Sequence, residues 1–358
     1  MTMSLLRSLL ITLTAALSGA AVFSLLSFPL PWMLGPLTAV MVFQAVIGKP
    51  LYWHPMMKNA GLIVLGISFG LYFTIETIVM TLPYFPLYII MTFLLIVVSV
   101  CLSYVVTKII PIDPASSIFG SIPGGLTEMV ITSQSFHANQ AYVTVFQTIR
   151  LVIVLFSVPF FILYLFDGES GSSFLGGPST GDEASLIHSF WYLLPAVLGF
   201  KYATLIPAGI MIIPLLITIM LAISPAVTPA VPEPLFLAAQ LAVGTSLGRS
   251  IAIHDVFQAG RFSLYYGGIA VILILFSFVS GYILSLMTEL NLATAMLSAA
   301  PGGVIEMVLT ADMVGADPAV VTALQLTRIL VILLFVPLGL KWFFVTILRQ
   351  PEQENVRD

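Results

Sequence analysis

The sequence is poor in charge, cysteine and histidine. Only 8% of its 358 residues are Asp, Glu, Lys or Arg, whereas a soluble domain carries about 25%. Hydrophobic residues make up 59% of the chain, more than a soluble fold can cover with polar surface. Many apolar runs reach the ~20 residues that a helix needs to cross a bilayer, and they do not alternate as barrel strands do. The sequence therefore predicts an all-α integral membrane protein embedded in a lipid bilayer.

The residue types that are scarce exclude several functions. The net charge is -4 and no basic run is present, which argues against nucleic acid as a partner. The single cysteine cannot form an internal disulfide, and no P-loop for ATP occurs. The four histidines do not stand at metal-ligand spacings, so we predict no metal and no other cofactor: they are His54, His137, His188 and His254. Without a metal set or a nucleophile motif in a fitting context, we expect no enzymatic activity.

One polar motif occurs twice in this apolar chain. Residues 123–130 read P-G-G-L-T-E-M-V, and residues 301–308 read P-G-G-V-I-E-M-V, 178 positions later. The same offset aligns prolines, small residues and polar residues far from the motif. A constant offset without gaps indicates duplication of a whole structural unit. We therefore predict a first membrane repeat over 1–166, a linker over 167–185 and a second membrane repeat over 186–358.

Each half offers five helices long enough to cross and one shorter segment broken by the repeated motif. The broken segments are 115–136 and 293–313. If they are re-entrant, each half crosses five times and the halves are inverted; if they cross, the halves run parallel. The inverted arrangement places every loop Lys and Arg on one side, as cytoplasmic loops require. It predicts ten crossings, two re-entrant hairpins and cytoplasmic termini. The rival is a broken helix that crosses while another segment does not.

The Pro-Gly-Gly turns are the first candidate site. Proline removes a hydrogen-bond donor and glycine adopts backbone angles that other residues resist. A helix broken at membrane depth leaves backbone groups that must be buried in protein or line a wet cavity, and the helix that follows presents a positive end to anions. A kink without a ligand is the simpler alternative. The predicted tip residues are Pro123, Gly124, Gly125, Pro301, Gly302 and Gly303.

Glu128 and Glu306 lie in the first turn after the glycines. A carboxylate at that position complements the helix dipole, which is a purely structural role. Acids inside a membrane are costly and often serve a transport pathway, so the second interpretation is a site for proton or ion coupling. The sequence leaves both interpretations open.

Arg150 and Arg328 each lie about ten residues into a long apolar helix, roughly 15 Å deep at 1.5 Å per residue. A polar stripe on an apolar helix faces the protein interior. Each arginine could pair with the glutamate of its own hairpin, or it could bind an anionic substrate through its guanidinium group. The predicted substrate-binding residues on the two stripes are Arg150, Arg328, Gln147, Gln325, Thr144 and Thr322.

The pattern G-x-S-x-G also occurs twice, at residues 66–70 and 244–248. It can mark a hydrolase nucleophile, but that role needs a strand before the serine and a helix after it. Here the pattern lies inside an apolar helix, where small residues four apart favour close helix packing. We therefore expect a packing motif.

Two copies of P-G-G-[LV]-x-E-M, each followed by a helix with Q-x-x-R, resemble the AbrB-type integral membrane proteins of bacteria. The resemblance covers nearly the whole chain, and it implies an internal membrane duplication and an effect on gene expression. Some members of that family carry the label of an ammonia monooxygenase, but this sequence has no metal constellation for that reaction. Five crossings and a hairpin in each inverted half are similar to secondary carriers only at the level of fold.

The sequence therefore predicts a secondary transporter in the bacterial cell membrane, with one half rocking against the other. It would move a small, anionic solute with an ion gradient. The alternative is a membrane-embedded protein that affects transcription indirectly. The sequence does not name the solute or the coupling ion, and it leaves a homo-oligomer open.

Overall fold

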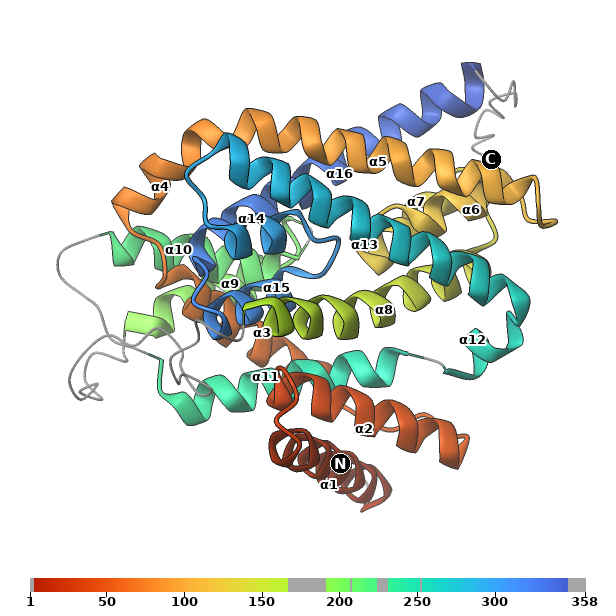
Figure 1. The fold of residues 1–358 in the computed structure, drawn as a ribbon. Helices are drawn as coiled ribbons and strands as arrows, with labels where there is room; N and C mark the ends of the chain where they lie inside the picture. The colour runs from red at the N-terminus through yellow and green to blue at the C-terminus, as the bar shows by residue number, and fades with distance from the viewer. Residues whose placement is uncertain (1–2, 167–190, 207, 224–230, 252, 347–358) are drawn as a thin grey trace, which may run out of the picture.

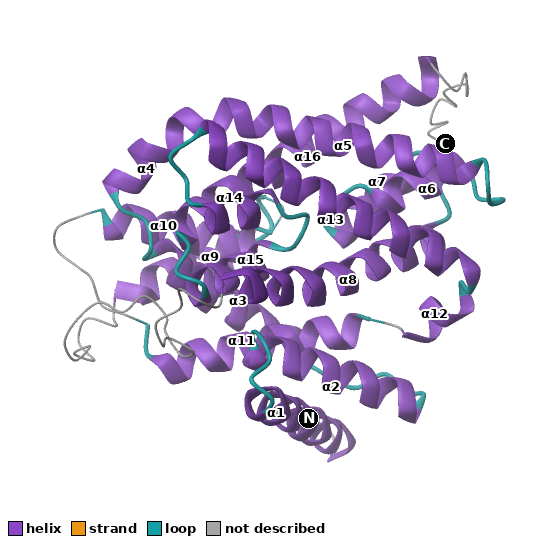
Figure 2. Cartoon of the chain, viewed as in Figure 1, coloured by secondary structure: helices purple, strands orange, loops and turns teal. Residues whose placement is uncertain are grey.

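The computed structural model describes residues 3–166, 191–206, 208–223, 231–251 and 253–346. Over these residues the chain is helical and contains no strand (Figure 2). Five helical stretches are long and apolar enough to cross a membrane: Arg7–Leu25, Ile75–Thr107, Gln140–Phe166, Arg261–Met287 and Pro318–Leu340. Many large apolar side chains on these helices are exposed at the outer surface, as lipid-facing residues are. The protein is an all-α membrane protein, and the predicted linker lies outside the described residues.

The helices follow one order in both halves of the chain (Figure 1). The first half contains α1 (Met3–Leu25), α2 (Pro31–Ile47), α3 (Pro55–Gly70), α4 (Ile75–Thr81), a 3-10 turn at Leu82–Tyr84, α5 (Phe85–Thr107), α6 (Pro114–Ser121), α7 (Leu126–Gln134) and α8 (Gln140–Phe166). The second half contains α9 (Leu193–Tyr202), α10 (Gly209–Ala222), α11 (Glu233–Ser250), α12 (Ile253–Gln258), α13 (Arg261–Met287), α14 (Leu292–Ala299), α15 (Val304–Met313) and α16 (Pro318–Thr346).

Helices α2, α3, α6, α7 and α8 begin 178 positions before α10, α11, α14, α15 and α16, respectively. Proline is the local signal at the start of several of these helices. Proline occupies the first turn of α2, α3 and α6 in the first half, where its missing N–H costs nothing. His54 also caps α3 by accepting a hydrogen bond from the Met56 N–H.

The six helices α1, α2, α3, α9, α10 and α11 pack mainly against one another, and we call them the glycine bundle. A Cβ atom on Gly66 would lie 2.4 Å from the Met211 carbonyl oxygen, and one on Gly244 would lie 2.2 Å from the Met33 carbonyl oxygen. No side chain fits between backbones at that separation. The G-x-S-x-G patterns are therefore packing motifs, as expected, and they join α3 to α10 and α11 to α2.

The directions of these helices follow from the same contacts. Gly244 and Gly248 of α11 meet Met33 and Leu37 of α2 in the same order, so α2 and α11 run parallel. Helix α3 meets α11 in the reverse order: Gly61 approaches the Ala239 carbonyl, whereas the Trp53 carbonyl, just before α3, accepts a hydrogen bond from Arg249 at 3.1 Å. Helix α3 and the helix that begins 178 positions after it therefore run antiparallel.

The remaining long helices α5, α8, α13 and α16 surround the two broken segments, and we call this group the hairpin bundle. Helices α5 and α13 lie side by side and cross the molecule in opposite directions (Figure 1). Each bundle contains helices from both halves of the sequence. The halves are therefore interlocked, because α2 is held by α11 and α3 by α10.

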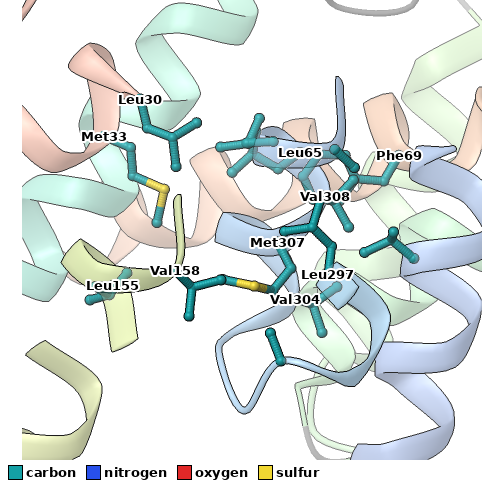
Figure 3. Close-up of a cluster of buried hydrophobic side chains, with 14 of the residues drawn as sticks. Leu30, Met33, Leu65, Phe69, Leu155, Val158, Leu297, Val304, Met307 and Val308 are labelled. Atoms are coloured by element: carbon teal, nitrogen blue, oxygen red, sulfur yellow. The ribbon is translucent and has the colours of Figure 1, made fainter. Parts of the chain in front are cut away.

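An apolar layer lies between the two bundles. Leu30 and Met33 of α2 and Leu65 of α3 face a set from the hairpin bundle (Figure 3). That set includes Leu155, Val158, Leu297, Val304, Met307 and Val308. The side chains drawn in this layer carry no polar atoms. Their burial stabilises the contact between the two bundles, but it does not fix a single position of one bundle against the other.

Candidate functional site at the two hairpin tips

The first broken segment, residues 114–134, returns to the level where it begins, and we call it hairpin 1. Asp113 caps α6 by accepting a hydrogen bond from the Ser116 N–H at 2.7 Å. The Asn139 N–H, just before α8, donates to the Ser116 hydroxyl at 2.6 Å. The start of α8 therefore lies beside the start of α6, and the eight residues of α6 span only about 12 Å. Hairpin 1 enters the bundle and turns back.

Hairpin 2, residues 292–313, has the same construction. Asn291 caps α14 by accepting from the Thr294 N–H at 2.7 Å. The Asp317 N–H, just before α16, donates to the Thr294 hydroxyl at 2.9 Å. Each residue in these contacts of hairpin 2 lies 178 positions after the corresponding residue of hairpin 1.

The glycines of the tips serve close packing, and the expectation of unusual backbone angles is wrong. Gly125 and Gly303 have φ values of -65° and -76°, which any residue adopts. Space is the constraint instead, because a Cβ atom on Gly124 would lie 2.8 Å from Met129 and one on Gly302 would lie 2.7 Å from Met307. The methionine of each motif folds back over its own turn.

The two arginines bind the carbonyl groups at which the first half-helices end. Arg150 donates to the Ile122 carbonyl, and to the Gly124 carbonyl at 3.0 Å. Arg328 donates to the carbonyls of Ala300 and, at 2.6 Å, of Gly302. Both side chains are buried, with 7% and 2% exposed. Helix ends buried in a membrane need such donors, so each guanidinium group holds a broken helix together.

The glutamines complete the same caps. Gln147 donates to the carbonyls of Phe119 at 2.6 Å and Ile122 at 3.0 Å. Gln325 donates to Leu297 at 2.7 Å and to Ala300 at 3.2 Å, and its own oxygen accepts from Arg328. The Q-x-x-R spacing thus places an amide and a guanidinium on one face of the long helix, both directed at its hairpin.

Thr144 and Thr322 lie nearer the start of the long helices. Their hydroxyls donate to carbonyls of their own helix, those of Gln140 at 2.7 Å and Pro318 at 2.6 Å. Neither hydroxyl is directed to a hairpin tip by these bonds. The predicted polar stripe therefore divides into a threonine that bonds locally and a Gln–Arg pair that reaches the tip.

The hairpin tips contact the long helices more than a third of the way along them. Arg150 is ten residues into α8, which corresponds to about 15 Å. Each tip also packs on the long helix of the other half. A Cβ atom on Gly302 would lie 3.2 Å from Val154 of α8, and Ile122 of hairpin 1 shares a buried cluster with Ile332 of α16.

Glu306 lies over the start of its own helix. Its side chain is 6% exposed, and its Oε2 atom would be 2.1 Å from a Cβ atom on Gly303. Oε2 has no hydrogen-bond partner, and neither has Nε of Arg328. The terminal nitrogens of Arg328 bind carbonyls and Gln325 rather than Glu306. The side chain of Glu128, the corresponding acid of hairpin 1, lies outside the described residues.

Two tyrosines that the sequence analysis did not select hold each hairpin to a helix of the other half. The Tyr88 hydroxyl of α5 donates to the Ser298 carbonyl at 2.7 Å, and the Tyr266 hydroxyl of α13 donates to the Ser117 hydroxyl at 2.7 Å. Both tyrosines are 2% exposed. The available signal was the 178-residue offset, which relates Tyr88 to Tyr266 within two apolar runs.

Two very small cavities adjoin the guanidinium groups: the one beside Arg328 has a volume of about 10 Å³, room for at most one water molecule, and the one beside Arg150 has no room for a water molecule. The cavity beside Arg328 is bounded by Tyr88 and by hydroxyl side chains, those of Thr92, Ser277 and Ser280. The cavity beside Arg150 is bounded by Tyr266 and mainly by apolar side chains, including Phe146, Ile269, Ala270 and Leu273. Among the residues that the model describes, no group of three or more His, Cys, Asp or Glu side chains could hold a metal ion.

The long apolar helices and the two buried hairpins define a class, that of polytopic helical membrane proteins with broken segments inside the bundle. The family model described as "Transition state regulatory protein AbrB" matches residues 32–344. The chain belongs to this AbrB family. The match confirms the resemblance to that family that the doubled motif indicated.

A relative from Bacillus subtilis (strain 168), the "Uncharacterized protein YhjN", is 24% identical, and the match covers 89% of each chain. No solved structure matches the chain.

Proposed function

We propose that this protein is a secondary transporter of small organic anions, driven by an ion gradient across the bacterial cell membrane. The observation that carries the proposal is the pair of hairpin tips, which stop roughly 15 Å along the long helices with a buried cation at each. Broken helices at the midplane are the usual construction of a transport site, because their free ends bind substrates and ions. The two neighbouring guanidinium groups and the positive ends of α7 and α15 favour an anion.

The proposal includes two inverted repeats, ten crossings and cytoplasmic termini. The antiparallel directions of α3 and α11 and of α5 and α13 support the inversion. The excess of Lys and Arg in the loops of one side supports the orientation.

The moving bodies that we propose are the two bundles rather than the two halves. The halves are interlocked by α2–α11 and α3–α10, so neither half can rock as a rigid unit. The layer between the bundles is formed by apolar side chains such as Met33, Leu65, Val158 and Val308. Such a layer can slide without breaking hydrogen bonds, which suits alternating access to a site carried by the hairpin bundle.

The arginines have a double role in this proposal. They cap α6 and α14 permanently, and their positive charges attract the anion to the tips. The Nε atoms of Arg150 and Arg328 have no partner, so each guanidinium retains at least this donor. Thr144 and Thr322 contribute to the path toward the tips, and Glu128 and Glu306 are the candidates for ion coupling.

Flux into proteoliposomes tests the proposal. Purified wild-type protein would be reconstituted with an inward proton or sodium gradient, and uptake of labelled acetate, lactate and succinate would be measured. We expect gradient-dependent uptake of at least one anion, and at least a tenfold loss in Arg150→Ala and Arg328→Ala. Arg249→Ala is the matched control, because Arg249 also donates to a backbone carbonyl but lies in the glycine bundle.

Equal flux in wild type and both tip variants would end the proposal for the arginines. Absence of uptake for every anion under both gradients would end the transporter proposal. The family description would then favour an indirect effect on gene expression, and a double Arg150→Ala, Arg328→Ala variant would still restore expression in a deletion strain.

A further inference from the structure

The amino end of α15 is a place built for a carboxylate, and the protein's own Glu306 occupies it. Glu306 is the third residue of α15, and its carboxyl group lies against Gly303, the residue that precedes the helix. The first N–H groups of a helix have no partner within the helix, and the helix dipole adds positive potential there. Glu306 thus stands where the carboxylate of a bound anion would stand.

The carboxyl group of Glu306 is incompletely satisfied in this place. It is 94% buried, given its 6% exposure, and its Oε2 atom has no hydrogen-bond partner. An ionised carboxylate is costly in such surroundings unless it is paired, whereas a protonated carboxyl group is not. Glu306 therefore has two accessible states: ionised at the helix end, or protonated and free to leave it.

The charged groups on the helices packed around α15 favour an anion at this position. Arg328 on α16 and Arg150 on α8 are both buried, and each directs its guanidinium group to a hairpin tip. The other titratable groups lie at the far end of α15, where Asp312 approaches Tyr72 next to α3. With Glu306 neutral, the described tip region would hold two positive charges and no negative one.

From this geometry we propose that the transported anion binds at the amino end of α15 by replacing the Glu306 carboxylate, which leaves when it takes up a proton. The inference rests on the proposed function and names its coupling ion. One helix end does not hold two ionised carboxylates, because like charges at contact distance repel strongly. The ionised Glu306 carboxylate therefore excludes the anion. The balance is one proton taken up by Glu306 for each anion bound, so anion and proton move together in the same direction.

Proton uptake on binding tests the inference without transport. Detergent-purified protein in weakly buffered solution with a pH indicator would be mixed with acetate, lactate or succinate adjusted to the same pH. At a pH above the pKa of Glu306, where this carboxyl group is ionised before binding, wild-type protein should take up about one proton per anion bound. Above the pKa of Glu306, its apparent Kd should rise about tenfold per pH unit, because binding requires the protonated form.

Two variants separate the role of Glu306 from a general effect on folding. Glu306→Gln should bind the same anion without proton uptake, with a Kd that changes less than twofold across that pH range. Asp312→Asn is the matched control, since it removes a carboxylate from the other end of the same helix and should retain both effects. Glu306→Asp keeps the titrating group and should retain proton uptake if Glu306→Gln does not fold.

The outcomes are distinguishable from those of the flux experiment. Proton uptake and pH dependence that persist in a folded Glu306→Gln variant would overturn the inference, while the transporter proposal would stand. Wild-type binding of an anion without proton uptake would overturn it as well. Failure of all three anions to bind would overturn the inference, and absence of flux would overturn the proposed function beneath it.

Discussion

Hairpin 1 and hairpin 2 use the same residue types at the same spacing, yet their polar groups have different partners. The side-chain oxygen of Gln325 accepts a hydrogen bond from Arg328, whereas the corresponding oxygen of Gln147 has no partner. Four side chains with a hydroxyl group line the cavity beside Arg328, whereas two, those of Ser121 and Tyr266, line the cavity beside Arg150. The repeated motif preserves the construction of the tips, and the surrounding helices make them chemically unequal.

This inequality suggests different tasks for the two tips. Hairpin 2 has the more completely bonded cap and the more polar surroundings, both of which favour a precise binding site. Hairpin 1 has a buried amide oxygen without a partner, which costs free energy in this state. Under the transport proposal, we therefore expect hairpin 1 to be the one that changes its packing.

Substitution of the two arginines should give the largest difference in stability between hairpin 1 and hairpin 2. We expect Arg328→Ala to lower the free energy of unfolding by about 3 kcal/mol and Arg150→Ala by about 2 kcal/mol, since each leaves buried carbonyls without a donor. Arg328 also loses its bond to Gln325, which has no counterpart in hairpin 1. Thermal unfolding of detergent-purified variants measures both values.

Arg249→Ala serves as the control for loss of an exposed cation that binds one backbone carbonyl, and it should cost less than about 1 kcal/mol because it removes one hydrogen bond. A larger loss for Arg150→Ala than for Arg328→Ala would contradict the ranking of the two caps.

The sequence predicted the positions of these arginines but not what they bind. A buried cation is readable from its depth in an apolar run, as at Arg150 and Arg328. Its partners were not readable, because the carbonyls of Ile122 and Ala300 belong to the backbone and carry no signal in the residue types. An acidic partner or a substrate was therefore the natural expectation, whereas the structure directs the terminal nitrogens to the ends of broken helices.

The fold was predictable where the pattern is local. The all-helical fold, the broken segments and the packing role of the G-x-S-x-G motifs follow from apolar runs, prolines and small residues. The division into two bundles did not follow, because the pairing of α2 with α11 depends on contacts between residues more than 200 positions apart, such as Met33 and Gly244. A pattern within one helix indicates which face is buried, but not which helix covers it.

Substitutions at the glycine contacts should lower the stability equally in the two halves of the chain. Gly66→Ala and Gly244→Ala should each cost about 2 kcal/mol, because a Cβ atom would meet a backbone carbonyl and force two helices apart. Gly268→Ala is the control, since nothing lies within 4 Å of its Cβ position, and it should be neutral or stabilising by up to about 1 kcal/mol. Thermal unfolding compares the three. Costs for Gly66→Ala and Gly244→Ala that differ by more than about 1 kcal/mol would mean that the asymmetry extends into the glycine bundle.

Loss of the tyrosine hydroxyls should give the smallest difference in stability between the two hairpins. The loss should again be larger at hairpin 2. Tyr88→Phe removes a donor from the Ser298 carbonyl, which keeps only a long contact of 3.3 Å from Gln325. Tyr266→Phe removes a donor from the Ser117 hydroxyl, which still donates to the Ser103 carbonyl at 2.9 Å.

We therefore expect a loss of about 1 kcal/mol for Tyr88→Phe and about half of that for Tyr266→Phe. Denaturation of both variants in one detergent would measure these losses, and Tyr282→Phe, an exposed tyrosine on α13, is the control. If Tyr266→Phe is the costlier change, the hydroxyl pair in hairpin 1 holds its tip more firmly than the carbonyl contact in hairpin 2. Hairpin 1 would then be the fixed element, and the hairpin with the more polar cavity would be the one that moves.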